Sequence, residues 1–131
     1  MGSFKSFEEL ACWKESRILR NYVKDEIIPL LPDSEKFGLA SQIQRSSRSV
    51  GNNIAEGFGR FNYQENIQFC RMARGSLNET LDHMIIALDE NYIEEEKLNN
   101  FRGLYNRTLK ILNGYIKYLR DAKLKFKPIT D

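Results

Sequence analysis

Apolar residues recur three and four positions apart through four long segments of this 131-residue chain. That spacing gathers side chains on one face of an α-helix, whereas a half-buried strand alternates at every second residue. The clearest seam, in the last segment, consists of Leu98, Phe101, Tyr105, Thr108, Leu112, Tyr115, Leu119 and Ala122. Because no segment shows strand alternation, the sequence predicts an all-α fold.

The residues that start and stop helices set the expected limits. A capping box at residues 6–9 is expected to begin the first helix, and Pro29 is expected to end it. Asn62 is a good N-cap for the third helix, and the glutamates at 94–96 suit the positive end of the fourth. The four helices are therefore expected over residues 6–28, 35–59, 62–91 and 94–124.

The short connections between these segments imply antiparallel neighbours. We expect one domain over residues 1–124, an antiparallel up-down-up-down four-helix bundle, followed by a tail over residues 125–131. The first and fourth helices carry more apolar residues than one seam requires, which indicates self-association through them. The first helix has two adjacent apolar lines, one of Ala11, Ile18 and Tyr22 and one of Cys12, Leu19, Val23 and Ile27. The fourth helix adds a second line of Leu104, Ile111 and Tyr118 beside its seam.

Residues 50–60 form a polar, glycine-rich run within the second helix. Gly51 with Asn52 is expected to bend this helix or to interrupt its hydrogen bonding. Gly57 and Gly59 are expected to make its C-terminal turn, since glycine accepts positive φ. A phosphate-binding loop is rejected because the Gly-Lys-Ser/Thr ending and a preceding strand are both missing.

The polar side chains of this run permit two interpretations. Asn53, Glu56 and Arg60 share one helix face, which is either a recognition surface or part of a hydrogen-bond network that fixes the second helix against the third. We favour the network. The glutamates at 56, 65 and 79 are expected to pair with Arg45, Arg48, Arg71 or Arg74 rather than to act in acid–base catalysis, since buried charges are retained only in pairs.

Residue types that catalyse reactions or bind metals are sparse. His83 is the only histidine, whereas a carboxylate-bridged di-metal bundle needs a Glu-x-x-His motif on each of two helices. Cys12 and Cys70 are too few for a disulfide framework, have no histidine nearby in sequence, and are expected to be buried, reduced thiols. We therefore expect no enzyme activity, no metal and no cofactor.

The chain contains no run of about 18 apolar residues, so no transmembrane helix is expected. Its N-terminus also lacks an apolar signal-peptide core. We expect a cytoplasmic protein with no membrane partner.

Charge is unevenly distributed although the net charge is only +2. Residues 1–35 carry five basic and seven acidic groups (net −2), residues 36–75 six and two (+4), residues 76–100 one and seven (−6), and residues 101–131 eight and two (+6). A cationic helix can bind nucleic acid. Charge alone favours the alternative, a solvated helix face countered by neighbouring helices.

Several short motifs resemble the family of four-helix-bundle proteins encoded in intervening sequences of bacterial 23S rRNA genes. The matching residues are Trp13-Lys14, Phe37-Gly38-Leu39 with Gln42 and Arg45, Ser49, the run of residues 53–57 with Gly59-Arg60, Glu65 and Phe69, and residues 73–77 with Glu79. Gly51 departs from the usual proline of this motif, and Arg48 from a usually apolar residue.

The resemblance implies an antiparallel four-helix bundle that assembles as a homopentamer and has no enzymatic activity. It also implies kinship with the accessory variability protein of diversity-generating retroelements, a basic pentamer that associates with nucleic acid and with a reverse transcriptase. The motif residues expected to form the structural network are Arg45, Ser49, Asn53, Glu56, Gly57, Glu65 and Glu79.

With this kinship, our leading hypothesis is a homo-oligomer that binds RNA or DNA through basic surfaces. The expected phosphate contacts are Arg48, Arg60, Arg71, Arg74, Arg107, Lys110, Lys117, Arg120 and Lys123. The alternative is a protein-interaction scaffold without a nucleic-acid role, in which neighbouring copies place acidic segments against basic ones.

Overall fold

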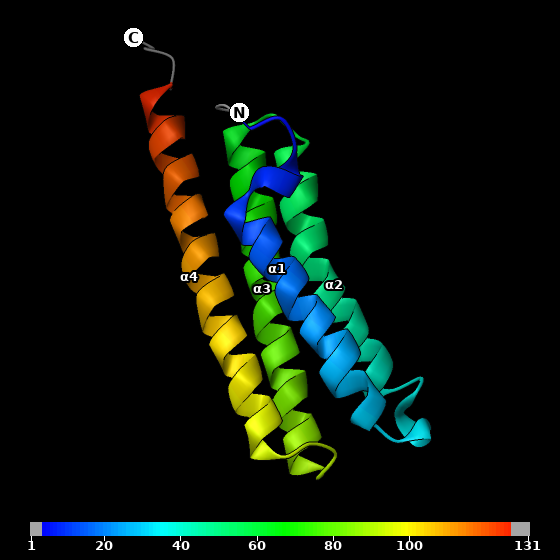
Figure 1. Cartoon of the computed structure of the whole chain (residues 1–131). Coiled ribbons are helices and arrows are strands. Elements are labelled where there is room, and N and C mark those ends of the chain that lie inside the picture. Colours follow the sequence, from blue (N-terminus) through cyan, green and yellow to red (C-terminus); the bar gives the residue numbers. More distant parts are fainter. Residues whose placement is uncertain (1–3, 127–131) are drawn as a thin grey trace.

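The computed structural model describes residues 4–126 and contains four long α-helices (Figure 1). They are α1 (Ala11–Tyr22), α2 (Leu39–Phe58), α3 (Tyr63–Asp89) and α4 (Glu95–Lys125). A π-helical turn (Val23–Ile27) and a 3-10 turn (Ile28–Leu30) prolong α1, and further 3-10 turns cover Phe7–Glu9 and Asp33–Glu35. No strand occurs between residues 4 and 126.

Successive helices run in opposite directions, as the sequence predicts (Figure 1). Both α1 and α3 pack against α2 and against α4, so each helix has two neighbours in a four-helix bundle. The start of α1 and the end of α4 lie at the same end of the bundle as the α2–α3 connection (Figure 1). The all-α up-down-up-down bundle is therefore confirmed.

The core follows the three-and-four spacing of the sequence. All four helices contribute fully buried side chains, among them Leu19, Ile43, Leu77 and Leu112. Thr108 lies in the buried seam of α4. Its Oγ1 donates to the Leu104 carbonyl oxygen at 2.7 Å, so the buried Thr108 hydroxyl has a hydrogen-bond partner.

The first helix begins later than predicted. Ser6 does act as a cap, since its Oγ accepts a hydrogen bond from the Glu8 amide at 3.1 Å, but it caps only the 3-10 turn Phe7–Glu9. Leu10 follows in an extended conformation and is buried in the core. Because the chain must turn at Leu10 to bury it, the α-helix starts at Ala11.

The second helix also begins later, at Leu39 rather than at Glu35. The Glu35 side chain accepts a hydrogen bond from the Leu39 amide (3.1 Å) and another from the Tyr92 hydroxyl (2.9 Å). These two bonds hold the pKa of Glu35 below its ordinary value. Glu35 therefore caps α2 from outside and joins the α1–α2 connection to the α3–α4 connection.

The prediction that Gly51 and Asn52 interrupt the second helix is wrong, because α2 is continuous through both. Gly51 instead makes room for α1: a Cβ atom there would lie 2.9 Å from Ser16 Oγ. The C-terminal turn also differs from the prediction. Gly57 lies within α2, Gly59 has a negative φ (−71°), and the positive φ (53°) falls on Phe61.

The limits of the last two helices agree with the prediction. Asn62 Oδ1 accepts a hydrogen bond from the Glu65 amide at 2.9 Å and caps α3, which ends two residues before Asn91 (φ 64°). Glu94 is the N-cap of α4. A tail is expected over residues 125–131, but Lys125 is still part of α4. Residues 127–131 lie outside the described part of the chain.

Gly57→Ala is expected to lower the free energy of unfolding by about 1–3 kcal/mol, since small-to-large changes in packed sites cost this much. The added Cβ would lie 2.7 Å from Asn66 Oδ1 and 2.8 Å from Phe69 Cβ. Gly75→Ala in α3 is the matched control, because a Cβ there meets nothing within 4 Å. The control should gain up to about 1 kcal/mol in helix propensity. Urea unfolding of both variants measures the difference, and equal stabilities would contradict the close packing of α2 on α3.

Candidate nucleic-acid interface

Hydroxyl and amide side chains connect α2 to α3. Ser49 Oγ and Ser76 Oγ are 2.8 Å apart, and Thr80 Oγ1 donates to Ser46 Oγ at 2.8 Å. Asn53 Nδ2 donates to both the carbonyl oxygen (2.9 Å) and the hydroxyl (3.0 Å) of Ser49. Asn53 is half-buried and bonds within α2, where it acts on the α2–α3 contact only through Ser49.

The remaining polar residues of the expected network lie outside it. Glu56, Glu65, Glu79 and Arg45 are exposed. Of the seven residues expected in the network, only Gly57 is buried. The predicted pairs of these glutamates with Arg45, Arg48, Arg71 or Arg74 do not form among the described residues; Glu56 bonds Arg60 at 3.0 Å and Glu79 lies 3.4 Å from His83 Nε2. Both partners lie four residues further along the same helix, where side chains are neighbours on the surface.

Five of the nine candidate cations are bound to other side chains of the bundle, among them Lys123, which donates to Gln64 Oε1. Arg107 Nε donates to Glu15 of α1 at 2.8 Å, and Arg74 Nη1 donates to Asn113 of α4 at 2.8 Å. The other two intramolecular pairs are Arg60 with Glu56 at 3.0 Å and Lys117 with Asp121 at 3.0 Å. Arg48 lies elsewhere, beside Arg20 and Lys24 between α1 and α2, and Lys110 is exposed on α4. The nine residues therefore do not form one continuous surface.

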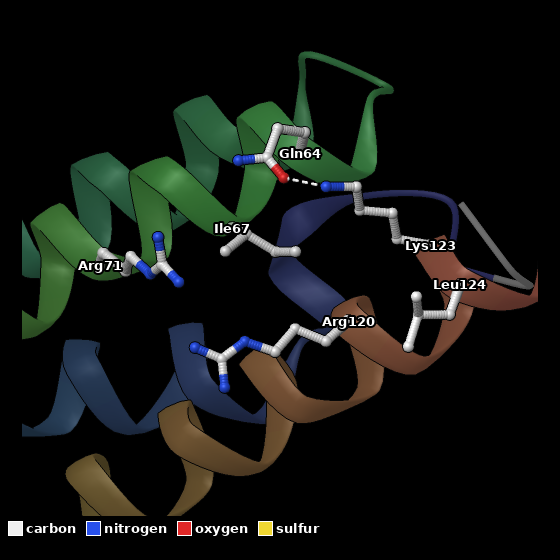
Figure 2. Close-up of a pocket in the computed structure, with 6 residues that line it drawn as sticks. All are labelled: Gln64, Ile67, Arg71, Arg120, Lys123 and Leu124. Atoms are coloured by element: carbon white, nitrogen blue, oxygen red, sulfur yellow. Dashed lines mark hydrogen bonds between the residues drawn. The ribbon is translucent and has the colours of Figure 1, made fainter. Parts of the chain in front are cut away.

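Three candidate cations do come together, in a pocket of about 410 Å³ between α3 and α4 (Figure 2). The lining residues are Gln64, Ile67 and Arg71 from α3 and Arg120, Lys123 and Leu124 from α4. Figure 2 shows Arg71 and Arg120 extending toward one another at one side of the pocket, while Lys123 Nζ donates to Gln64 Oε1 at the other.

The pocket carries uncompensated positive charge. None of its six lining residues is acidic, and within residues 4–126 neither Arg71 nor Arg120 forms an ion pair. A concave site lined by one sign of charge focuses the electrostatic field and concentrates counter-ions. The polar surface continues along both helices. On α3, Arg74 lies three residues after Arg71; on α4, Lys117 lies three residues before Arg120 and Asn113 four residues before Lys117. This arrangement suits an anion.

Neutral residues complete the pocket, and the sequence analysis did not find them. Gln64, Ile67 and Leu124 carry no charge or motif, so only their place in the bundle connects them with the three cations. Spacing along α4 could have placed Leu124 beside Arg120, four residues earlier. The distance between α3 and α4 at this level could not be read from the sequence.

The residues most often used in catalysis lie apart from this pocket. Cys12 and Cys70 are buried in the core as free thiols, and burial raises the pKa of each to about 12. Both thiols are therefore protonated at neutral pH, and thiolate is the nucleophilic form. Within residues 4–126 no three histidine, cysteine or carboxylate side chains group as metal ligands would. No helix in that range is long and apolar enough to cross a bilayer.

A family model described as "23S rRNA-intervening sequence protein" matches residues 8–114, which is most of the chain. The chain belongs to this family. The match includes α1, α2, α3 and the first two-thirds of α4, and ends before Arg120 and Lys123. The resemblance seen in the sequence is therefore confirmed, while the kinship with the accessory variability protein stays a prediction.

A solved structure supports the fold of this intervening-sequence protein. It is a crystal structure at 1.70 Å resolution of a protein with unknown function from the S23 ribosomal protein family of Bacteroides thetaiotaomicron. The two chains share 23% identity and a TM-score of 0.73, and the match covers 81% of this chain and 98% of that one. Among curated proteins, none matches the chain.

Arg107→Ala is expected to lower the free energy of unfolding by about 1 kcal/mol, because it leaves the buried Glu15 carboxylate without its partner. The exposure of Arg107 to water limits the cost, since solvent screens the pair. Lys110→Ala on the exposed face of α4 removes the same charge and should leave the stability unchanged. Urea unfolding compares the two, and equal stabilities would show that Arg107 is not a structural residue.

Proposed function

We propose that this protein binds RNA, without catalysing a reaction on it, through the α3–α4 pocket and the basic surface beside it. The observation that carries the proposal is the convergence of Arg71, Arg120 and Lys123 with no acidic side chain among the lining residues. Phosphates are the anions that such clusters bind in proteins, often bidentately through arginine.

Five of the nine candidate cations contribute to this surface, namely Arg71, Arg74, Lys117, Arg120 and Lys123. Contacts of this kind neutralise phosphates and carry little sequence information. Arg48 and Lys110 add to the positive field from other faces. Arg60, Arg107 and Lys117 are paired with Glu56, Glu15 and Asp121, so Lys117 contributes less to the field of this surface than the other four cations. The family description names the intervening sequence and no ligand, so single-stranded RNA is the first ligand to test and single-stranded DNA is its comparison.

A triple variant, Arg71→Gln with Arg120→Gln and Lys123→Gln, is expected to weaken RNA binding by at least tenfold. It should also reduce the slope of log affinity against log salt by about 2, since each lost phosphate contact on a single strand removes about 0.7. Fluorescence anisotropy of a labelled single-stranded RNA, measured from low to moderate salt, provides both quantities.

The matched control is Lys14→Gln with Lys24→Gln and Lys36→Gln, which removes the same charge from exposed positions outside the pocket. Equal losses in the two triple variants would point to a general effect of net charge. Wild-type binding that is absent at low salt, or that ignores salt, would contradict the proposed function itself.

We also propose that the protein is a homo-oligomer, a pentamer by its resemblance, that assembles through the surface where α1 meets α4. Ile18 of α1 is 49% exposed and Tyr118 of α4 is 42% exposed. Leu104 and Ile111 of α4 are only partly buried. These are the apolar lines that exceed the needs of one bundle, and a second copy would remove them from water.

Ile18→Glu is expected to reduce the assembly to smaller species, because a charge in an apolar interface is left without a partner. Phe37→Glu is the control, since Phe37 is equally apolar but lies in the α1–α2 connection. Light scattering at matched concentrations gives the mass of each variant. A wild-type monomer would contradict the proposal, and so would an Ile18→Glu variant that keeps the wild-type mass.

A scaffold without RNA is the second candidate, and charge placement favours it. Glu90, Glu94, Glu95 and Glu96 are exposed at the α3–α4 connection, at the opposite end of the bundle from Arg120 and Lys123 (Figure 1). Opposite charges at opposite ends suit contact between copies. Light scattering with and without RNA separates the two candidates, since a scaffold keeps its mass when RNA is added.

A further inference from the structure

We propose that the α3–α4 pocket holds one unpaired nucleotide of a single-stranded RNA, with its phosphate on the cations and its base against the apolar part of the pocket. This inference rests on the proposed function and gives it a ligand class. It predicts that the protein distinguishes single strands from duplexes, which a flat basic surface does not do.

The first argument is the shape of the pocket. Its volume of about 410 Å³ falls within the range of small-molecule sites, roughly 300–1,000 Å³, and its walls come from two helices (Figure 2). In a duplex the bases are paired and stacked in the interior of the double helix. A base can therefore enter a protein pocket only after it is flipped out of the duplex. An unpaired nucleotide enters without that cost.

The second argument is the division of the pocket into two chemical parts. Arg71 and Arg120 extend toward one another at one side, where their guanidinium groups can hold a phosphate (Figure 2). Ile67 lies between them and Leu124, whose side chain is 70% exposed. A site for inorganic anions alone needs no apolar part, whereas a nucleotide offers both a charged phosphate and a flat base.

The third argument concerns hydrogen bonding at the edge of the pocket. Lys123 Nζ donates to Gln64 Oε1, and this bond orients the Gln64 amide across the α3–α4 seam. The Nε2 atom of Gln64 makes no hydrogen bond within residues 4–126, so its two N–H groups are available as donors. Nucleobases carry carbonyl and ring-nitrogen acceptors that such donors recognise. An arginine plane can also stack on a base.

Aromatic side chains nearby offer a competing platform for a base. Tyr63 and Phe126 stack with ring centroids 6.3 Å apart and line, with Tyr118, a second cavity of about 420 Å³. Residues 118, 122 and 125 face away from residues 120, 123 and 124 by the helical period, so this cavity lies on another side of α4. Asp121 and Lys125 both line it, so their charges offset and it lacks the excess positive charge of the α3–α4 pocket.

The test uses the full chain and a short single-stranded RNA with one 2-aminopurine, whose fluorescence rises when it leaves a base stack. We expect a severalfold rise on binding, at least tenfold weaker binding of the matching duplex, and displacement of the strand by adenosine monophosphate at lower concentration than by inorganic phosphate. Leu124→Ser should weaken single-strand binding by about fivefold, since it removes apolar contact with the base. It should leave duplex binding and the salt slope unchanged, because the cations remain.

Phe126→Ser is the matched control, an exposed apolar residue beside the aromatic cavity. Loss of the fluorescence rise in this variant, with Leu124→Ser unaffected, would move the base to the aromatic cavity and overturn the inference. Equal affinity for strand and duplex would overturn it as well, as would equal displacement by the nucleotide and by phosphate. In those cases salt-dependent binding persists and the proposed function stands, whereas loss of all RNA binding at low salt removes both.

Discussion

One buried amide, that of Asn66, fixes three helices relative to one another. Its Nδ2 donates to the Tyr115 hydroxyl of α4 at 3.1 Å, and its Oδ1 accepts from the Cys70 thiol at 3.5 Å. On the third side α2 comes so close that only a glycine, Gly57, fits against this oxygen. An amide buried without partners costs several times what one hydrogen bond contributes, so this arrangement tolerates little displacement. Burial also raises the pKa of Tyr115, so its hydroxyl stays protonated beyond the pH at which an exposed tyrosine ionises.

The pocket opens one helical position away from this fixed point. Ile67 follows Asn66 along α3, and the side chains that face one another farther out are Arg71 and Arg120. Two guanidinium groups cannot pack against each other as two leucines do, because like charges repel when they are brought out of water. The α3–α4 seam is therefore closed by the amide at its core and left open at its surface. A rigid floor with cationic walls is a site in which little has to reorganise when an anion binds.

In the described part of the chain, charged side chains are paired along much of the bundle and unpaired in the α3–α4 pocket. Cations near an acidic neighbour, such as Arg107 beside Glu15 and Lys97 beside Glu26, connect α4 to the first helical segment. In the α3–α4 pocket, by contrast, no lining residue is acidic, and neither Arg71 nor Arg120 forms an ion pair within residues 4–126. The acidic end, around the α3–α4 connection, would repel phosphate, so a nucleic acid bound as we propose would have a preferred position on the molecule.

The sequence alone determined the number of helices, their antiparallel order and the cap at Asn62, because apolar spacing and capping act within a few residues of each other. The starts of α1 and α2 depended on tertiary contacts, since Leu10 had to be buried and Glu35 bonds to Tyr92. The role of Gly51 also depends on packing. The sequence predicted that Gly51 interrupts α2, whereas in the structure it leaves room for Ser16 of α1. The charge distribution included Arg71, Arg120 and Lys123 among the candidate cations but did not distinguish them from six others. Only the register between α3 and α4 brought these three together with Gln64, Ile67 and Leu124, because residues so far apart in the chain share no local signal.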